Sequence, residues 1–236
     1  PARCLIIASL AVLSPCTIGH GDEPSHPSRE VLQRAETSLP SPEVVDAGMG
    51  RLGDALLIWG GSSTSNPGGE PTNRVLRLDL SLPGSVWRAV ESSLPASIRG
   101  PLSLTHPERG ILSIGGSTVD GPTDRCWLLV GGSDGEPTIR EIPSLPTPLE
   151  GTAGAMVGDE IIVFGGRDAA GGPPTDRVWR LDLAEPNSWR AAADLPGGCV
   201  DAVGGSHRGK VYGVGGTDRD GRPVRETWRD DPATDA

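Results

Sequence analysis

The fold is decided by the stretch from Pro146 to Pro196, whose sequence is PTPLEGTAGAMVGDEIIVFGGRDAAGGPPTDRVWRLDLAEPNSWRAAADLP. An apolar segment at 160–164 ends in the glycine pair 165–166, and segment 177–183 alternates between apolar and polar residues, as a half-buried strand does. A short turn leads into Trp189, and the unit closes at Leu195-Pro196. Four short strands in about fifty residues, separated by turn residues, predict one blade of a β-propeller.

The same unit recurs along the chain. Glycine pairs lie at 60–61, 115–116, 165–166 and 215–216, and Leu-Pro pairs lie at 39–40, 94–95, 145–146 and 195–196. Segment 74–80 (RVLRLDL) repeats segment 177–183 (RVWRLDL). Two independent landmarks with one common period predict an all-β fold in residues 31–236 with four visible blades, at 41–95, 96–146, 147–196 and 197–236.

This pattern resembles the kelch repeat. Segment 31–40 matches the last strand of a blade, whereas the chain stops after the third strand of the fourth blade. Either the N-terminal strand completes that blade and closes a ring of four, or the chain is a fragment of a larger propeller. Because kelch rings usually have six or seven blades, we expect a kelch-type β-propeller that is a fragment of a six-bladed ring.

The charge balance restricts the kind of partner. The 236 residues contain 21 Lys and Arg against 31 Asp and Glu, a net charge of −10. Such a surface repels phosphate backbones, so we expect no nucleic acid partner. No glycine-rich loop leads into a helix, as a phosphate-binding loop would, and we expect no cofactor.

The N-terminus resembles an export signal. Arg3 precedes an apolar run at 4–13 that is too short to span a bilayer but suits a signal peptide, and we expect a signal-peptide-like segment at 1–18. The polar, proline-rich segment 19–30 is expected to be a flexible spacer. Export to the periplasm, cell envelope or exterior follows, with Cys16 as a candidate lipid anchor although Pro15 departs from the usual lipoprotein box. The alternative is a misassigned start upstream of a cytosolic protein.

Metal and disulfide sites are not expected. Cys126 and Cys199 fall in non-adjacent blades, too far apart for a disulfide, and no Cys/His spacing suits zinc. The segment 218–221 (DRDG) superficially resembles a calcium loop, but it lacks the other spaced oxygen ligands. We therefore expect a solvated blade loop there.

Candidate site residues follow the Leu-Pro pairs. In a propeller the innermost strands line a central channel, so residues at equivalent repeat positions gather at its mouth. Asp46 and Asp201 occupy the same position relative to their glycine pairs, Glu150 precedes that position by one residue, and Arg99 lies close to it. Carboxylates and a guanidinium converging there suit a polar ligand or proton transfer. The alternative is that they only satisfy backbone groups between blades.

Several segments resemble the bacterial N-acetylneuraminate epimerase and cyclically permuted mutarotase group of kelch proteins. They are residues 146–166, 179–183 with 195–198, and the DRDG loop with 231–234. The resemblance implies an exported, cofactor-free sugar epimerase or mutarotase, with Glu150 and Asp201 as catalytic residues and Arg99 and Asp46 as substrate-binding residues. In that group Pro-Gly-Gly is usually followed by Pro-Arg, where this chain has Cys199 and Val200.

Two other functions compete with the enzyme. A non-catalytic kelch module would bind carbohydrate or protein through the loops of one face, and a passive domain of an envelope protein would do neither. The repeated aromatic residues do not decide between these functions. Trp179 and Trp228, with Leu76 and Trp127 as counterparts, keep the period of the strands, so we expect them to be buried between blades instead of stacking on sugars.

Overall fold

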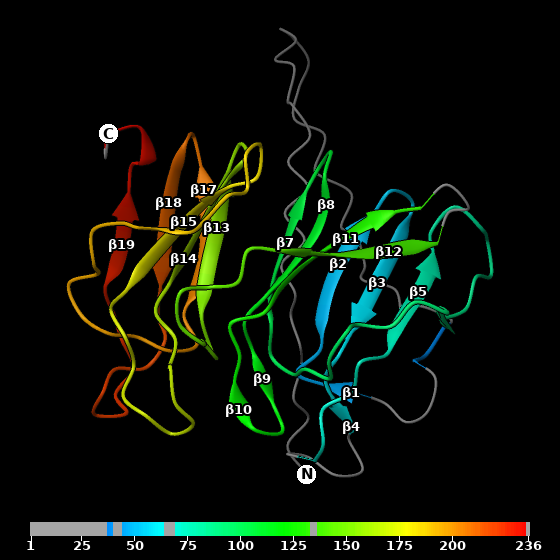
Figure 1. Ribbon diagram of the computed structural model, residues 1–236, viewed down its shortest axis with the longest axis horizontal. Coiled ribbons are helices and arrows are strands. Elements are labelled where there is room, and N and C mark those ends of the chain that lie inside the picture. Colours follow the sequence, from blue (N-terminus) through cyan, green and yellow to red (C-terminus); the bar gives the residue numbers. More distant parts are fainter. Residues whose placement is uncertain (1–36, 40–43, 64–68, 133–135, 235–236) are drawn as a thin grey trace, which may run out of the picture. The chain divides into compact units, whose positions relative to one another are not determined.

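The computed structural model describes residues 37–39, 44–63, 69–132 and 136–234. Its main elements are antiparallel sheets that follow one another along the chain (Figure 1). Blade 1 contains β2 (Gly48–Leu52), β3 (Ala55–Trp59), β5 (Val75–Asp79) and β6 (Arg88–Ala89). Blade 2 contains β7 (Leu102–His106), β8 (Gly110–Ile114), β11 (Cys126–Gly131) and β12 (Pro137–Ile142). Blade 3 contains β13 (Ala153–Val157), β14 (Glu160–Phe164), β15 (Val178–Asp182) and β16 (Arg190–Ala191).

Blade 4 has three strands among the described residues, β17 (Val203–His207), β18 (Lys210–Val214) and β19 (Thr227–Asp230). Two short strand pairs lie in the loops, β1 (Val44–Val45) with β4 (Ser62–Ser63) and β9 (Ser117–Thr118) with β10 (Gly121–Pro122). The one helical element in the described part is a 3₁₀ turn, η1 (Pro232–Thr234). The predicted all-β propeller with four blades is therefore confirmed.

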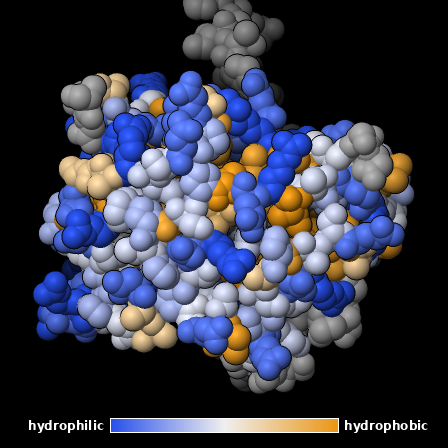
Figure 2. All heavy atoms as spheres, viewed as in Figure 1, coloured by the Kyte–Doolittle hydropathy of each residue, from blue (hydrophilic) through white to orange (hydrophobic). Residues whose placement is uncertain are grey.

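Other sequence predictions lie outside the described residues. These are the signal-like segment, the spacer, Cys16 and most of segment 31–40, of which only residues 37–39 are described, without a strand. No helix in the described part has the length and apolar character needed to cross a membrane. Figure 2 shows hydrophilic side chains over most of the visible face.

The glycine pairs join each blade to the next. The second glycine of a pair donates its N–H to a carbonyl of the following blade, from Gly61 to Ile98 at 2.7 Å and from Gly116 to Leu149 at 2.8 Å. Both glycines of each pair have positive φ, and a Cβ on Gly60 would lie 2.5 Å from the Ile98 carbonyl oxygen. Glycine is required because no side chain fits this close approach of two backbones.

The core consists of apolar layers between neighbouring blades. Trp59 and Leu57 of blade 1 pack with Ile111 and Leu129 of blade 2, and similar layers lie between blades 2 and 3 and between blades 3 and 4. Two indole N–H groups donate hydrogen bonds from one blade to its neighbour. Trp59 Nε1 donates to Ser113 Oγ at 2.9 Å, and Trp189 Nε1 donates to the Pro143 carbonyl oxygen at 2.8 Å. The blades therefore share their cores with their neighbours.

The predicted burial of the repeated aromatic position is confirmed for two residues and wrong for two. Leu76 and Trp127 are buried, whereas Trp179 and Trp228 are half-buried. Trp179 packs against the core between blades 2 and 3 without being fully covered. Trp228 lies on β19, which pairs with no outer strand among the described residues.

Candidate axial site

The same short antiparallel backbone pairing recurs near the axis in successive blades. A residue three positions before the innermost strand pairs with the residue that follows the glycine pair. The pairs are Arg99 with Ser117, Glu150 with Arg167 and Val200 with Thr217. In the Glu150–Arg167 bridge both backbone N–H groups donate to the partner carbonyl at 2.9 Å. These backbone hydrogen bonds fix the position of the main chain from which the side chains at these positions extend.

The next residue in each blade has a left-handed backbone. The φ angles are 54° at Asp46, 57° at Gly100, 61° at Gly151 and 58° at Asp201. Gly100 N–H donates to the Asp46 carbonyl at 2.6 Å, and Asp201 N–H donates to the Gly151 carbonyl at 2.8 Å. Aspartate tolerates this conformation better than most residues. The turns of adjacent blades therefore hold one another, and two of them carry a carboxylate.

These turns surround a pocket of about 260 Å³. The residues that line it come from all four blades: Asp46, Arg99, Gly100, Ser117, Glu150, Gly151, Arg167, Val200 and Asp201. The structure thus brings together the four residues that the sequence singled out, Asp46, Arg99, Glu150 and Asp201. Their catalytic and binding roles stay predictions.

The two candidate catalytic residues belong to the turns of adjacent blades that line the pocket. A Cβ built on Gly151 would lie 2.7 Å from Asp201 Oδ1, so the Asp201 carboxylate sits directly over the residue that follows Glu150. Glu150 is half-buried, whereas Asp201 is exposed. Glycine at 151 leaves the space that the Asp201 carboxylate occupies.

Two arginines line the same pocket, and sequence reasoning missed one of them. Arg99 Nε donates to Ser117 Oγ at 3.3 Å. Arg167 Nε is buried and has no hydrogen-bond partner within the described part of the chain. The repeat itself could have revealed Arg167. The position after the glycine pair holds Ser62, Ser117 and Thr217 in the other blades. A guanidinium replaces a hydroxyl there in blade 3 alone.

The structure explains the departure at Cys199 and Val200. Cys199 is equivalent to Ile98 and Leu149, since the carbonyl of each accepts the N–H of a glycine pair, and all three side chains are buried. Val200 occupies the ladder position of Arg99 and Glu150 and is buried as well. Blade 4 therefore places an apolar group where blades 2 and 3 place a charge.

The two cysteines in the described part of the chain are buried thiols. Burial raises the pKa of the Cys126 thiol to about 12 and that of Cys199 to about 11, so neither is a ready nucleophile. Neither Cys126 nor Cys199 takes part in a disulfide. Asp218 Oδ1 accepts the backbone N–H groups of Asp220 and Arg222, as in a self-contained turn. No cluster of three metal-ligating side chains occurs among the residues that the structure describes.

A second, larger hollow of about 520 Å³ lies beside the β9–β10 hairpin. Its walls include Glu70, Ser97, Asp120 and Asp124, with exposed Val119. The residues that line this hollow come from blades 1 and 2. The axial pocket is the better candidate because all four blades build it.

Comparison with known proteins agrees with this architecture. The family model described as the kelch motif matches residues 148–196. Over 77 residues the chain is 34% identical to N-acetylneuraminate epimerase of Pasteurella multocida strain Pm70. That match covers 32% of this chain and 19% of the relative, about a fifth of its length.

Proposed function

We propose that this kelch-type β-propeller binds an acidic sugar of the sialic-acid type in the axial pocket and acts on it as a cofactor-free epimerase or mutarotase. One observation carries the proposal. Three carboxylates and two arginines from all four blades line a single pocket: Asp46, Glu150, Asp201, Arg99 and Arg167. The partial similarity to a sialic-acid epimerase supports a sugar as the ligand.

Binding would rest on the two arginines. A guanidinium binds a carboxylate through two parallel hydrogen bonds, and a buried donor without a partner costs about 1–3 kcal/mol. Arg167 Nε is such a donor within the described part, so an anionic ligand would relieve its cost. The pocket volume of about 260 Å³ lies just below the roughly 300–1,000 Å³ of sites for drug-sized molecules and suits a monosaccharide.

The reaction would be an acid/base ring opening, in which one proton is removed from the sugar and another is added to it. A base removes the proton of the anomeric hydroxyl while an acid protonates the ring oxygen, so the bond between the anomeric carbon and the ring oxygen breaks. The open chain then closes on the other face of the carbonyl with the two roles reversed. Glu150 and Asp201 would serve as this pair, because both line the pocket and Asp201 Oδ1 lies beside Gly151, the residue after Glu150.

Export belongs to the proposal as well. The apolar run at 4–13 after Arg3 supports a signal peptide, and Cys16 would carry a lipid if the segment is processed as in lipoproteins. An exported epimerase would meet its sugar outside the cytoplasm.

The second candidate function is a non-catalytic kelch module that binds a carbohydrate or a protein. Val200 favours it, because the apolar side chain fills the ladder position that carries Arg99 and Glu150 in blades 2 and 3. In this case the pocket would bind its ligand without turnover.

Anomer interconversion of N-acetylneuraminate, followed by NMR, separates the two functions. We expect the chain to exceed the buffer rate and Glu150→Gln and Asp201→Asn each to lower that gain by about 10²–10⁴-fold, the usual contribution of an acid or base. Asp120→Asn, an exposed residue of the β9–β10 loop, is the matched control and should keep the rate. A parent chain no faster than buffer rejects the enzyme, and retained binding of the sugar would then support the module.

A further inference from the structure

We infer that the carboxylate of the acidic sugar binds at the blade 2 wall of the axial pocket, where the Ser117 hydroxyl acts with Arg99 as an anion-binding pair. The inference rests on the proposed function, because it takes the ligand to be an acidic sugar. It adds the place of the acid group and a further residue that binds it.

The charges on the pocket walls favour blade 2. Among the described residues that line the pocket, each of the other blades contributes one carboxylate: Asp46 of blade 1, Glu150 of blade 3 and Asp201 of blade 4. Blade 2 contributes Arg99, Gly100 and Ser117, and none of these carries a negative charge. Blade 3 also contributes an arginine, but together with its glutamate. The Coulomb energy of an anionic group is therefore most favourable at the blade 2 wall.

The main chain and the side chain of Arg99 are both bonded to Ser117. The backbone N–H of each residue donates to the carbonyl of the other at 2.9 Å, and Arg99 Nε donates to Ser117 Oγ at 3.3 Å. The guanidinium has no other partner within the part of the chain that the structure describes. The two terminal amino groups of Arg99 thus stay available for a ligand, and their forked arrangement matches a carboxylate.

The Ser117 hydroxyl has a proton left to donate. Ser117 is 6% exposed, and it is the hydroxyl-bearing residue among the described residues that line the pocket. Its oxygen accepts the bond from Arg99, but its O–H has no acceptor in the described ranges. A buried donor without an acceptor is costly, and a hydroxyl that accepts a hydrogen bond becomes a better donor. A ligand carboxylate would supply the missing acceptor.

The blade 2 wall lies beside the candidate catalytic residue Glu150. Gly116 N–H donates to the Leu149 carbonyl at 2.8 Å, and Ser117 and Glu150 are the residues that follow the two ends of this bond. A carboxylate held by Ser117 would therefore bring the carbon that bears it close to Glu150. In sugars of the sialic-acid type this carbon is the anomeric carbon, whose bond to the ring oxygen breaks in the proposed reaction.

Calorimetric titration of the 236-residue chain with N-acetylneuraminate tests the inference. Ser117→Ala should raise the dissociation constant about tenfold or more, because it removes a hydrogen bond to a charged group. Ser117→Thr should restore most of the affinity, since it keeps the hydroxyl and blade 4 has Thr217 at the equivalent position. Thr118→Ala is the matched control and should leave the affinity unchanged, because Thr118 is the next residue of β9 but lines the hollow beside the β9–β10 hairpin.

Two further measurements separate a contact with the carboxylate from a structural effect. The methyl ester of N-acetylneuraminate has no negative charge, so Ser117→Ala should weaken its binding by a smaller factor than that of the acid. Ser117→Cys keeps a side chain of similar size but is a weak donor, and it should lower the affinity for the acid as Ser117→Ala does. All of these variants keep both backbone bonds to Arg99, so we expect them to fold.

The outcomes distinguish this inference from the proposed function. A parent chain that binds the acid with an affinity that Ser117→Ala and Ser117→Cys leave unchanged contradicts the inference and leaves the proposed function standing. Equal losses for the acid and the ester contradict it as well, because they would give Ser117 a structural role. A parent chain that binds neither compound rejects the proposed function and this inference with it.

Discussion

At the scale of single residues, buried polar groups join the blades through few but well-formed hydrogen bonds. Trp59 and Ser113 are both buried, come from different blades and share one bond of 2.9 Å. Ser103 lies opposite Ser113 on the neighbouring strand, and its hydroxyl is buried without a partner within the described part. Of these two adjacent serines, only Ser113 has a partner for its hydroxyl among the described residues.

Ser113→Ala should lower the free energy of unfolding by about 1–3 kcal/mol, because it leaves the Trp59 indole N–H buried and unpaired. Ser103→Ala is the control and should be neutral or slightly stabilising, since it removes an oxygen that accepts and donates nothing. Urea titrations followed by tryptophan fluorescence measure both. Equal effects of the two substitutions would contradict this account of the interblade bond.

The thiols give a second prediction at this scale. Because burial raises the pKa values of Cys126 and Cys199 to about 12 and about 11, almost no thiolate forms at pH 8 in the folded chain. Iodoacetamide at pH 8 should therefore spare both residues, and guanidinium should make both reactive. Peptide mass spectrometry distinguishes them from Cys4 and Cys16. Rapid labelling of Cys199 without denaturant would show that blade 4 opens readily.

Part of the axial site was predictable from single residues, and part was not. Asp46, Arg99, Glu150 and Asp201 follow the Leu-Pro landmarks, so their repeat position alone predicts that they face one axis. Arg167 follows the glycine pair, where the other blades carry hydroxyl groups. Its relevance depends on the cross-strand bridge to Glu150, a contact that no local pattern reveals.

At the scale of elements, the repeated sequence of the blades produces repeated strands and repeated turns. The aspartates of the two LDL segments end their strands in the same way, since Asp79 Oδ1 accepts the N–H of Ser81 and Asp182 Oδ1 accepts that of Ala184. Repeated sequence thus becomes repeated turn geometry, which is why strands β5 and β15 were predictable. The partial exposure of Trp179 was not, because the equivalent Leu76 has the same kind of cross-strand neighbour, an alanine, and is buried.

The contact between the β7–β8 and β13–β14 turns should depend on pH. Arg109 lowers the pKa of Asp159, with a smaller effect of His106. A lowered pKa in the folded state means that the ionised carboxylate stabilises the fold above the ordinary pKa of aspartate, and that this stabilisation is lost as the pH falls through the lowered value.

Asp159→Asn should therefore destabilise the chain at neutral pH and have a smaller effect in acid, below the pKa of the folded carboxyl group. Thermal unfolding from neutral pH down to about pH 3 measures the difference between parent and variant. Asp194→Asn is a control on an exposed loop. A difference that grows as the pH falls would contradict the assigned ion pair.

At the scale of the whole molecule, the repeat determines both the core and the site. Each blade buries one face against its neighbour, and each contributes a turn to the axial pocket. The period of the glycine pairs was sufficient to predict four blades. The number of blades in the complete ring stays a prediction, because one blade packs on the next in nearly the same way in rings of different size.

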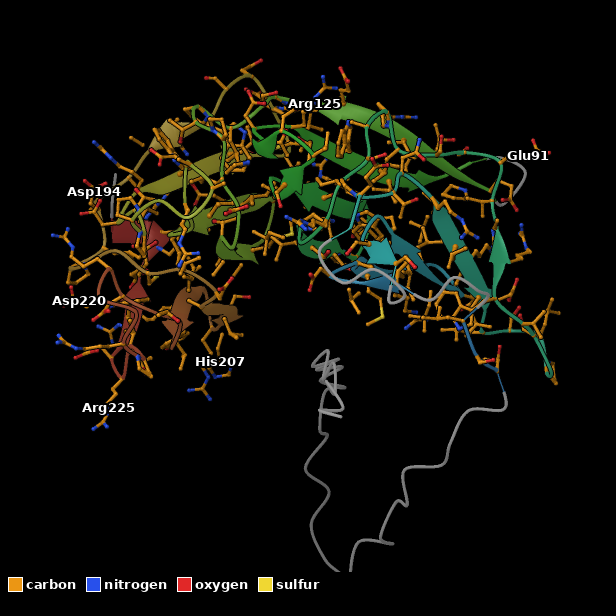
Figure 3. The ribbon with its side chains drawn as sticks, turned by 90° about the horizontal axis from the view of Figure 1, so that it is seen from below. Glu91, Arg125, Asp194, His207, Asp220 and Arg225 are labelled. Atoms are coloured by element: carbon orange, nitrogen blue, oxygen red, sulfur yellow. The ribbon has the colours of Figure 1, made fainter. Side chains whose placement is uncertain are left out.

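The central claim is that the axial pocket binds an acidic sugar, and calorimetric titration with N-acetylneuraminate tests it most directly. We predict binding by the parent chain, a loss of about tenfold or more in affinity for Arg167→Ala and for Arg99→Ala, and unchanged affinity for Arg125→Ala. Arg125 lies outside the axial pocket, on the surface of blade 2 (Figure 3). Absence of binding by the parent, or binding that neither Arg167→Ala nor Arg99→Ala weakens, would contradict the account.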